Sequence, residues 1–399
     1  MTRSSRGALI VVGLTAVAAS VRSEPPSDGV SIVQWLSADE LRGRGADTPD
    51  GERAGKQIES WMESAGLAPL FGESYRQQLD GVPHAFNVGG IVRGTMDEVV
   101  VVGAHYDGLG VPASGEFAGQ IHNGADDNAS GVAALLSIAR HLAALESPER
   151  GVAVVAFTGE ERGLLGSEFF VTNPPFDLAR AAAMINLDTV GRLESDRLIV
   201  FGTATAEEFP EILRGVNFGF RFDLALQDGD HGASDHTPFL QKGIPVLHFF
   251  TGARPEYHRP TDDAALVNHD GVTKIGAFVA ELAAYLATDA TPLTFRPPGV
   301  ARAEPTPGST RRRVSFGSIP DFAQESGGIL LSGVMPGSAA EEAGLAAGDT
   351  LVEIDGISID TIGDFQGVLA SHEPGDRVAV RYVRGGEERT CEVVLRERK

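Results

Sequence analysis

Cysteine is almost absent from this sequence. Its 399 residues include a single one, Cys391, so no disulfide can form within the chain. A zinc site built from several thiolates is excluded for the same reason. A metal site in this chain would therefore need histidine and carboxylate ligands.

Positive charge is also scarce. The chain has 33 Lys and Arg against 55 Asp and Glu, which gives a formal net charge of −22 at pH 7. No basic stripe is present that could neutralise phosphates, so the sequence argues against a nucleic-acid partner and against tight binding to anionic lipid. We attribute the acid excess to solubility, because net charge does not specify a partner.

Long hydrophobic runs are missing except near the N-terminus. There, Arg3 and Arg6 precede an apolar stretch over residues 8–19, and Ala16-Val-Ala18 fits a small-residue cleavage site. This pattern predicts a cleaved signal peptide over residues 1–23 and a secreted or periplasmic protein of bacterial type, with no other membrane contact. An uncleaved N-terminal anchor is the alternative.

The rest of the chain divides into three regions that differ in composition and in predicted secondary structure. Residues 24–290 alternate apolar strands with helical segments, residues 291–312 form a proline-rich linker, and residues 313–399 hold short strands and turns. The first region predicts an α/β fold, a mostly parallel mixed sheet sandwiched by helices. Within it we expect strands near 99–103, 152–157, 184–187, 198–201 and 245–249 and helices near 31–41, 51–64, 130–145, 164–171 and 272–286. The last region predicts a small β-rich domain.

Acid and histidine residues follow several of the predicted strands. Five short segments carry them, in this order: His105-Tyr-Asp107, Gly124-Ala-Asp-Asp127-Asn, Thr158-Gly-Glu160-Glu161, Asn186-Leu-Asp188 and Tyr257-His258-Arg. The carboxyl ends of parallel strands gather ligands at one edge of a sheet. Two His, two Asp and one Glu, with a second Glu beside it, suit a pair of zinc ions and a general base. These segments predict hydrolysis by metal-activated water.

Taken together, these segments resemble the co-catalytic di-zinc aminopeptidase family, which also contains glutamate carboxypeptidase and glutaminyl cyclase relatives. The resemblance covers residues 30–287 and also rests on Gly163-Leu-x-Gly166-Ser167, Ser234-Asp235-His236 and Pro260-x-Asp262. It implies that Asp127 bridges two Zn²⁺ ions. His105 and Asp188 would complete one site, and Glu161 and His258 the other.

The resemblance also implies roles around the metals. Glu160 would be the general base, and Tyr257 would donate its hydroxyl to the developing oxyanion. Supporting positions around the ligands fall to three acids: Asp107 (as the partner of His105), Asp126 and Asp235. His236 is assigned a supporting role together with Asp235. We interpret His122, His231 and His248 as structural or solvated, with His122, in the loop leading to Asp127, as the first candidate for an exception. That loop is glycine-rich and lacks the family's usual proline before Gly124, a departure that concerns substrate access.

The C-terminal region resembles a PDZ domain of the bacterial protease type. The residues that carry this resemblance are Val334-x-Pro336-x-Ser338-x-Ala340-x-x-Ala343-Gly344-Leu345-x-x-Gly348-Asp349 and Ile354-Asp-Gly356. Such domains bind extended peptide ends by strand addition. Our candidate for the loop that holds a peptide's terminal carboxylate is Phe316-Gly317-Ser318-Ile319.

The resulting hypothesis is an exported zinc metallopeptidase, most simply an aminopeptidase, that acts on peptides or proteins and carries a PDZ module for peptide or partner recognition. Two alternatives stay open, a glutaminyl cyclase-like acyltransferase and a non-catalytic, receptor-like relative. The sequence does not choose between an amino and a carboxyl terminus of the substrate. Co²⁺ or Mn²⁺ could replace Zn²⁺ on the same ligands.

Overall fold

The computed structural model describes residues 29–114, 117–229, 234–297, 314–320, 327–335, 337–360 and 362–397. The predicted signal peptide and linker residues 298–312 lie outside these ranges. No helix among the described residues has the length and apolar character needed to cross a bilayer. Two regions with separate hydrophobic cores make up the described chain.

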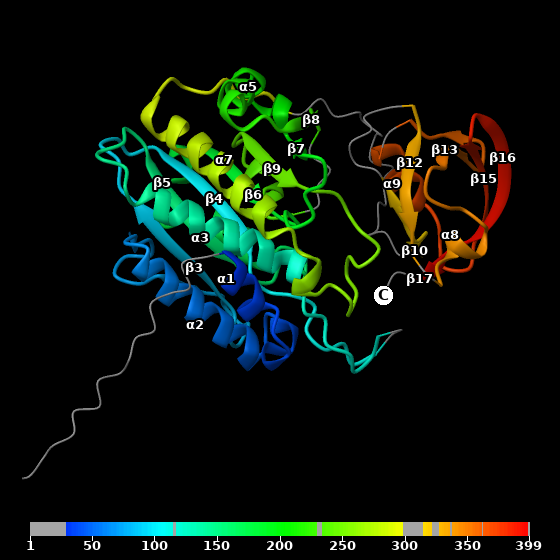
Figure 1. The fold of residues 1–399 in the computed structure, drawn as a ribbon, viewed down its shortest axis with the longest axis horizontal. Helices are drawn as coiled ribbons and strands as arrows, with labels where there is room; N and C mark the ends of the chain where they lie inside the picture. Colours follow the sequence, from blue (N-terminus) through cyan, green and yellow to red (C-terminus); the bar gives the residue numbers. More distant parts are fainter. Residues whose placement is uncertain are drawn as a thin grey trace, which may run out of the picture.

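The N-terminal region is built on one mixed sheet (Figure 1), with strand order β1-β3-β5-β4-β6-β9-β7-β8 and with β2 paired to β3. Its strands are β1 Ala68–Pro69, β2 Arg76–Gln78, β3 Phe86–Val92, β4 Val99–His105, β5 Gly151–Phe157, β6 Ala181–Leu187, β7 Arg197–Phe201, β8 Asp223–Gln227 and β9 Val246–Phe250. The central strands β5, β4, β6 and β9 run parallel. Strand β3 is antiparallel to β5, and β7 is antiparallel to β9. The predicted α/β class with a mostly parallel, mixed sheet is confirmed.

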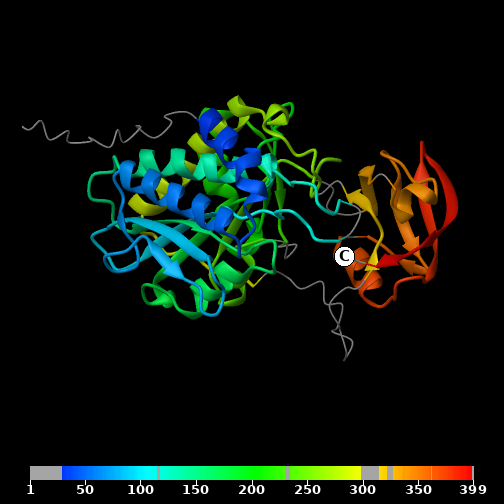
Figure 2. The ribbon, with the colours of Figure 1, turned by 90° about the horizontal axis from the view of Figure 1, so that it is seen from below.

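Helices cover both faces of this sheet, as the two views in Figures 1 and 2 show. Alternate residues of a strand point to opposite faces, so Val100 and Val102 enter one core cluster while Val101 enters another. The first cluster receives residues from α1 Gly29–Leu36, α2 Pro49–Ser64, α3 Gly131–Leu142, α5 Phe209–Phe220 and α7 His269–Thr288. The second receives residues from α4 Leu165–Thr172 and α6 Thr237–Gln241.

One predicted helix is shorter than expected. The helix over residues 31–41 ends at Leu36, and a 3-10 segment, Asp39–Arg44, follows it. Arg42, Gly43 and Arg44 all have positive φ angles of 42–67°. A Cβ on Gly43 would lie 2.4 Å from the carbonyl oxygen of His122, so only glycine fits there. This tight turn places Arg44 beneath the functional site.

The C-terminal region is β-rich, as predicted. Its elements are β10 Val314–Ser315, β11 Ser318–Pro320, β12 Ile329–Val334, α8 Ala339–Glu342, β13 Thr350–Ile354, β14 Ile357–Ser358, α9 Ile362–Ala370, β15 Arg377–Arg384, β16 Glu387–Val394 and β17 Arg396–Glu397. Ser338 caps α8 by accepting a hydrogen bond from the Glu341 N–H at 3.2 Å. Asp355 and Gly356, with φ angles of 48° and 79°, form the two-residue turn between β13 and β14.

Candidate metal centre

The predicted ligands meet at the carboxyl edge of the parallel strands. His105 is the last residue of β4, Asp188 follows β6 directly, and Glu161 lies in the loop after β5. His258 comes from the loop after β9, and Asp127 from the turn that leads into α3. Neighbouring parallel strands end at the same edge, which brings side chains distant in sequence together.

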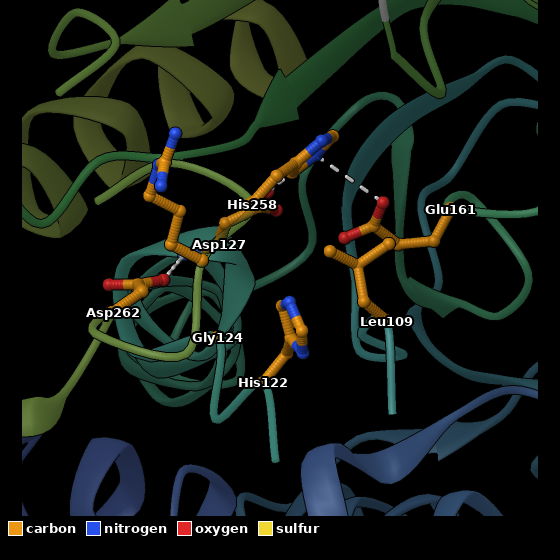
Figure 3. A pocket seen from close by; sticks show the side chains of 8 residues that line it. Leu109, His122, Gly124, Asp127, Glu161, His258 and Asp262 are labelled. Atoms are coloured by element: carbon orange, nitrogen blue, oxygen red, sulfur yellow. Dashed lines mark hydrogen bonds and ion pairs between the residues drawn. The ribbon is translucent and has the colours of Figure 1, made fainter. Parts of the chain in front are cut away.

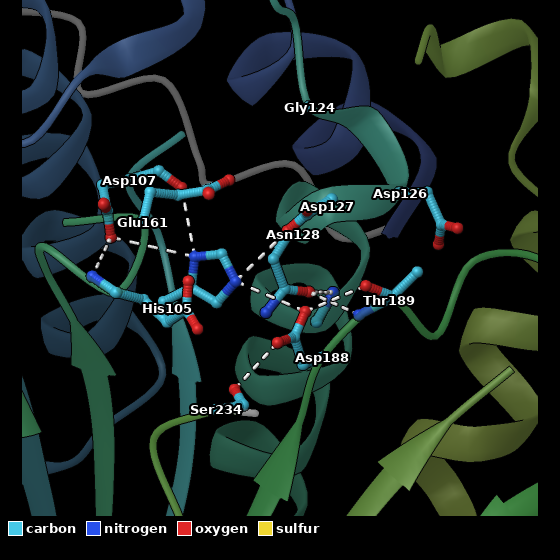
Figure 4. Close-up of polar contacts among 12 residues, drawn as sticks. His105, Asp107, Gly124, Asp126, Asp127, Asn128, Glu161, Asp188, Thr189 and Ser234 are labelled. Atoms are coloured by element: carbon cyan, nitrogen blue, oxygen red, sulfur yellow. Dashed lines mark hydrogen bonds and ion pairs between the residues drawn. The ribbon is translucent and has the colours of Figure 1, made fainter. Parts of the chain in front are cut away.

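These five side chains form two groups that share Asp127. In the first group, His105 Nε2 lies 3.3 Å from Asp127 Oδ1 and 3.3 Å from Asp188 Oδ1 (Figure 4). In the second group, His258 Nε2 lies 3.1 Å from Asp127 Oδ2 and 3.4 Å from Glu161 Oε2 (Figure 3). The potential ligand atoms within each group are all within 4.8 Å of one another.

The donor set of each group fits a catalytic zinc ion. Each group offers one imidazole and two carboxylates, and three protein ligands leave a coordination position open for water or substrate. The two oxygens of Asp127 face different histidines, the geometry that a carboxylate bridging two ions requires. Neither group depends on a thiolate.

Asp126 lies next to Asp127 but belongs to neither group. Its carboxylate accepts a hydrogen bond from the Gly191 N–H at 2.7 Å, and Figure 4 shows it directed away from His105. The backbone N–H groups of Asp126 and Asp127 both donate to the carboxylate of Asp262, at 3.0–3.1 Å. Asp262 therefore holds the backbone of the shared ligand in place.

Asp107 connects His105 to the loop that carries the two glutamates. Its Oδ1 lies 3.8 Å from His105 Nδ1 and accepts a hydrogen bond from the Glu160 N–H at 3.1 Å. The backbone oxygen of Asp107 is closer to Nδ1, at 3.2 Å. A proton on Nδ1 leaves Nε2 free to face the metal group.

Glu160 and Asp235 are carboxyl groups removed from water beside this cluster. Burial raises the pKa of Glu160 well above its ordinary value of 4.5, opposed by His105 and reinforced by Asp188. Burial likewise raises the pKa of Asp235 to about 7. Both oxygens of Asp235 are buried, and His105 and the nearby Ser167 hydroxyl oppose this rise in its pKa. Buried carboxyl groups with raised pKa values are typical of functional sites, where such groups take part in proton transfer.

Tyr257 stacks on His258, with ring centroids 3.9 Å apart and an angle of 20° between the planes. Partial burial and the nearby carboxylates, Asp127 first among them, raise the pKa of Tyr257 well above its ordinary value of 10. The hydroxyl therefore stays protonated and can donate a hydrogen bond.

Asp188 is oriented by a short chain of polar side chains. The hydroxyl of Ser234 donates to Asp188 Oδ2 at 2.8 Å, and the side-chain amide of Asn186 donates to that hydroxyl at 2.9 Å. The Thr189 hydroxyl donates to Asp188 Oδ1 at 3.0 Å. Ser234 belongs to the motif recognised in the sequence, but its contact with Asp188 becomes visible only in the fold.

Sequence reasoning missed Arg44, which lies fully buried below the site. Its guanidinium donates to the backbone oxygens of Tyr106 at 2.7 Å, Leu36 at 3.0 Å and Gly124 at 2.6 Å, and also to that of Asn123. Arg44 thus ties the turn before Asp127 to the residue after His105. An arginine in a glycine-rich segment is ordinarily read as solvated, so the sequence carried no signal for this role.

A pocket lies in front of the second group (Figure 3). Its lining comes from the loop after β4, the turn before α3 and the loop after β9, and consists of Leu109, His122, Gly124, Asp127, Glu161, His258, Arg259 and Asp262. Of the histidines that we read as structural or solvated, His122 is the one that the fold brings into this pocket. The only indication of this position in the sequence was that the loop containing His122 leads to Asp127.

The proposed carboxylate loop of the C-terminal region is a tight turn. Phe316 is fully buried and packs against Phe365, with ring centroids 5.3 Å apart, and Ile319 is also buried. The backbone oxygen of Gly317 accepts hydrogen bonds from the Met335 N–H at 2.8 Å and the Ser338 hydroxyl at 3.2 Å. Any part that this loop plays in peptide binding would come from its backbone, because the side chains of Phe316 and Ile319 belong to the core.

Comparison with known proteins matches each of the two regions to a known family. Residues 87–283 match the profile of peptidase family M28, and residues 320–395 match that of the PDZ domain. The chain therefore joins a domain of peptidase family M28 to a C-terminal PDZ domain.

Among individual relatives, "Aminopeptidase YwaD" of Bacillus subtilis is 29% identical over 246 residues, which cover 59% of this chain and 49% of the relative. The chain thus spans about half the length of that curated relative. The solved structure of the Legionella pneumophila LapA aminopeptidase has a TM-score of 0.55 at 19% identity, over 66% of this chain and 72% of the other. Porphyromonas gingivalis glutaminyl cyclase has a TM-score of 0.54 at 20% identity, over 64% and 96%. Both structures support the fold.

Proposed function

We propose that this chain is an exported, zinc-dependent aminopeptidase that hydrolyses the first peptide bond of a peptide or protein. The observation that carries the proposal is the pair of ligand groups that share Asp127, with Glu160 beside them. His105, Asp127 and Asp188 would hold one Zn²⁺, and Asp127, Glu161 and His258 the other, with Co²⁺ or Mn²⁺ as possible substitutes.

The zinc pair, when bound, would lower the pKa of a water molecule and polarise the carbonyl of the substrate. Glu160 is proposed as the general base that takes the proton of the attacking water and delivers it to the leaving amine. Its raised pKa supports this role, because the group can then hold the proton between the two transfers. Tyr257 would donate its hydroxyl to the oxyanion, while Asp107, Asp126 and Asp235 keep ligands and base in place.

The decisive experiment is a panel of aminoacyl-anilides, amino-blocked peptides and carboxyl-end substrates, assayed with and without a chelator. We expect cleavage of free-amine substrates alone and complete loss of activity with the chelator. Cleavage of carboxyl-end substrates alone would refute the aminopeptidase proposal. Formation of pyroglutamate by a protein that holds one zinc would instead identify a cyclase, and zinc binding without any turnover would identify a receptor-like relative.

The base is tested by Glu160→Gln, with Glu168→Gln on the exposed side of α4 as the matched control. General acid–base catalysis contributes about 10²–10⁴-fold, so kcat should fall by roughly that factor while zinc content stays unchanged. The control should behave as the unaltered protein. Equal activity of both variants would refute the assignment of Glu160.

The C-terminal region is proposed to bind an extended peptide end, with the backbone of residues 316–319 near the terminal carboxylate. Titration with peptides of identical sequence that end in a free or an amidated carboxyl group tests this. Stronger binding of the free acid supports the proposal, and equal binding contradicts it.

Export through a cleaved signal peptide over residues 1–23 is tested by determining the N-terminus of the mature protein.

A further inference from the structure

The pocket in front of the metal centre contains few side-chain acceptors that remain available once metals are bound. Of its eight lining residues, Asp127, Glu161 and His258 are the proposed ligands. The carboxylate of Asp262 accepts the backbone N–H groups of Asp126 and Asp127. His122 is the remaining lining side chain that can accept a hydrogen bond.

The position of His122 is firmly defined. Its N–H donates to the Gly110 oxygen at 3.0 Å, and its ring meets the ring of Phe117 edge-on, with centroids 5.8 Å apart. The side chain is 4% exposed, and Figure 3 shows the ring directed into the pocket toward His258. The ring is therefore held by the fold.

The tautomer follows from the neighbours of the ring. Nδ1 lies 3.4 Å from the backbone oxygen of Gln120, and a carbonyl oxygen only accepts, so Nδ1 carries the proton. Nε2 is then left with its lone pair. Burial, opposed by the Gln120 carbonyl and supported by the charge of His258, lowers the pKa of His122 and so favours this neutral form.

We propose that His122 Nε2 accepts a hydrogen bond from the free amino group at the N-terminus of the substrate. The proposal rests on the aminopeptidase function above and adds the group that recognises the amino end. A carboxylate would not suit this position, because its oxygens only accept hydrogen bonds and would face the lone pair of Nε2. The basic residue in the pocket, Arg259, lies over the ring of Phe117 at 5.1 Å. The recognised class of substrate is accordingly peptides with an unblocked amino end.

His122→Phe and His122→Gln separate this role from packing. Phenylalanine keeps the volume and the edge contact with Phe117 but has no acceptor, whereas glutamine restores an acceptor oxygen. The probes are leucine anilide and 4-methylpentanoic anilide, which is the same molecule without the amine and is used as a competitive inhibitor. Zinc content and the thermal midpoint of each variant are measured in parallel.

For His122→Phe we expect the KM of leucine anilide to rise about tenfold or more, the effect of losing one hydrogen bond to a charged group. The kcat should change little, because the amine is bound equally before and during the reaction. The inhibition constant of the deaminated analogue and the zinc content should stay as in the unaltered protein. His122→Gln should recover part of the KM.

An unchanged KM in His122→Phe would overturn the inference and leave the aminopeptidase function standing. Equal weakening of leucine anilide and its deaminated analogue would also overturn it, because it would show a steric effect. Failure of the unaltered, zinc-loaded protein to cleave leucine anilide or any other free-amine substrate would overturn both the function and the inference.

Discussion

The two regions of this molecule treat buried carboxylates differently. In the C-terminal region, Asp349 is fully buried and receives two hydrogen bonds from Arg384, at 2.5 and 2.6 Å, and one from the Ala346 N–H at 2.8 Å. In the M28 region, the carboxylates of Asp127 and Glu161 instead share one histidine, His258, and both line the pocket. A buried charge must be paired to be tolerated. The chain supplies the partner for Asp349, whereas the proposed partner of the other carboxylates is a metal.

The largest expected difference between the regions follows from removing one acid in each. Asp127→Asn should abolish binding of both metals, because the residue belongs to both groups. Activity should then fall by about 10³-fold or more, since metal activation is worth several kcal/mol. Asp349→Asn, the matched control, should keep its zinc and its activity. Zinc analysis and initial rates measure both variants, and one ion retained by Asp127→Asn would contradict the shared-ligand assignment.

Removing the arginine of each region should have the next largest effect. Arg44→Met leaves several buried carbonyl oxygens without donors, so the M28 region should lose about 3–5 kcal/mol of unfolding free energy. Arg384 is partly exposed, so Arg384→Met should cost its own region less. Both tryptophans, Trp35 and Trp61, belong to the M28 region, so tryptophan fluorescence during urea unfolding follows that region alone. The prediction fails if Arg44→Met unfolds at the same urea concentration as the unaltered protein.

Zinc binding should release protons. Burial raises the pKa of Glu161 to about 8. Burial would lower the pKa of His258, but Glu161 and Asp127 outweigh it and raise that pKa to about 9. The pair of Glu161 and His258 therefore holds at least one proton at pH 7 without metal, and ligands must lose their protons to bind zinc, so at least one proton should leave. Calorimetry in buffers of different ionisation enthalpy counts them, and an identical heat in all buffers would refute the prediction.

The stability of the two regions should depend on pH in opposite directions. The raised pKa values of Glu161 and His258 stabilise the metal-free M28 region at low pH, and this stability is lost as the pH rises through about 8 and 9. Burial alone would raise the pKa of Asp349, but Arg384 and the Ala346 N–H lower it, so its contribution is lost only in acid, below an ordinary value of 3.8. Calorimetric midpoints of the metal-free protein between pH 6 and 9 should fall for the M28 region only. Added zinc should suppress that fall.

The smallest effect is expected from Gly317→Ala. Gly317 has a φ of +78°, and a Cβ there would lie 2.2 Å from the Cβ of Ser338. The C-terminal region should lose at least about 1 kcal/mol, because the strained backbone and the contact with the cap of α8 act together. Cleavage of leucine anilide should not change. Gly367→Ala in α9, where a Cβ meets nothing within 4 Å, is the control.

Local sequence patterns predicted much of this fold. The β-branched runs that become β4 and β5 are buried on both faces, and such continuous apolar runs predict a central parallel strand. Strand β3 escaped notice because Gly89 and Gly90 weaken its strand pattern. The fold needs both glycines, since a Cβ on either would lie 2.7 Å from a side-chain atom of Leu70 or Leu67.

In the proposed site, the ligands were predicted from the sequence, whereas the roles of two residues that support them were not. The residue types and their order along the chain pointed to His105, Asp127, Glu161, Asp188 and His258, because each follows or precedes an element with a strong local signal. The roles of the supporting residues were not predicted, because their partners are backbone groups of distant segments, and no local pattern records such contacts. These supports are Arg44 beneath the turn and Asp262 behind the shared ligand.

By itself, the sequence determined the two kinds of region and the position of the acid and histidine segments at strand ends, since these follow from short-range hydrophobic periodicity and motif order. The resemblance to a known family implied which of these residues are the candidate ligands. Only the tertiary structure placed the two oxygens of Asp127 against different histidines, gave Asp126 its hydrogen bond from the Gly191 N–H, and directed His122 into the pocket. The physical reason is that a side chain's direction depends on the hydrogen bonds and packing of its whole surroundings, which the fold alone assembles.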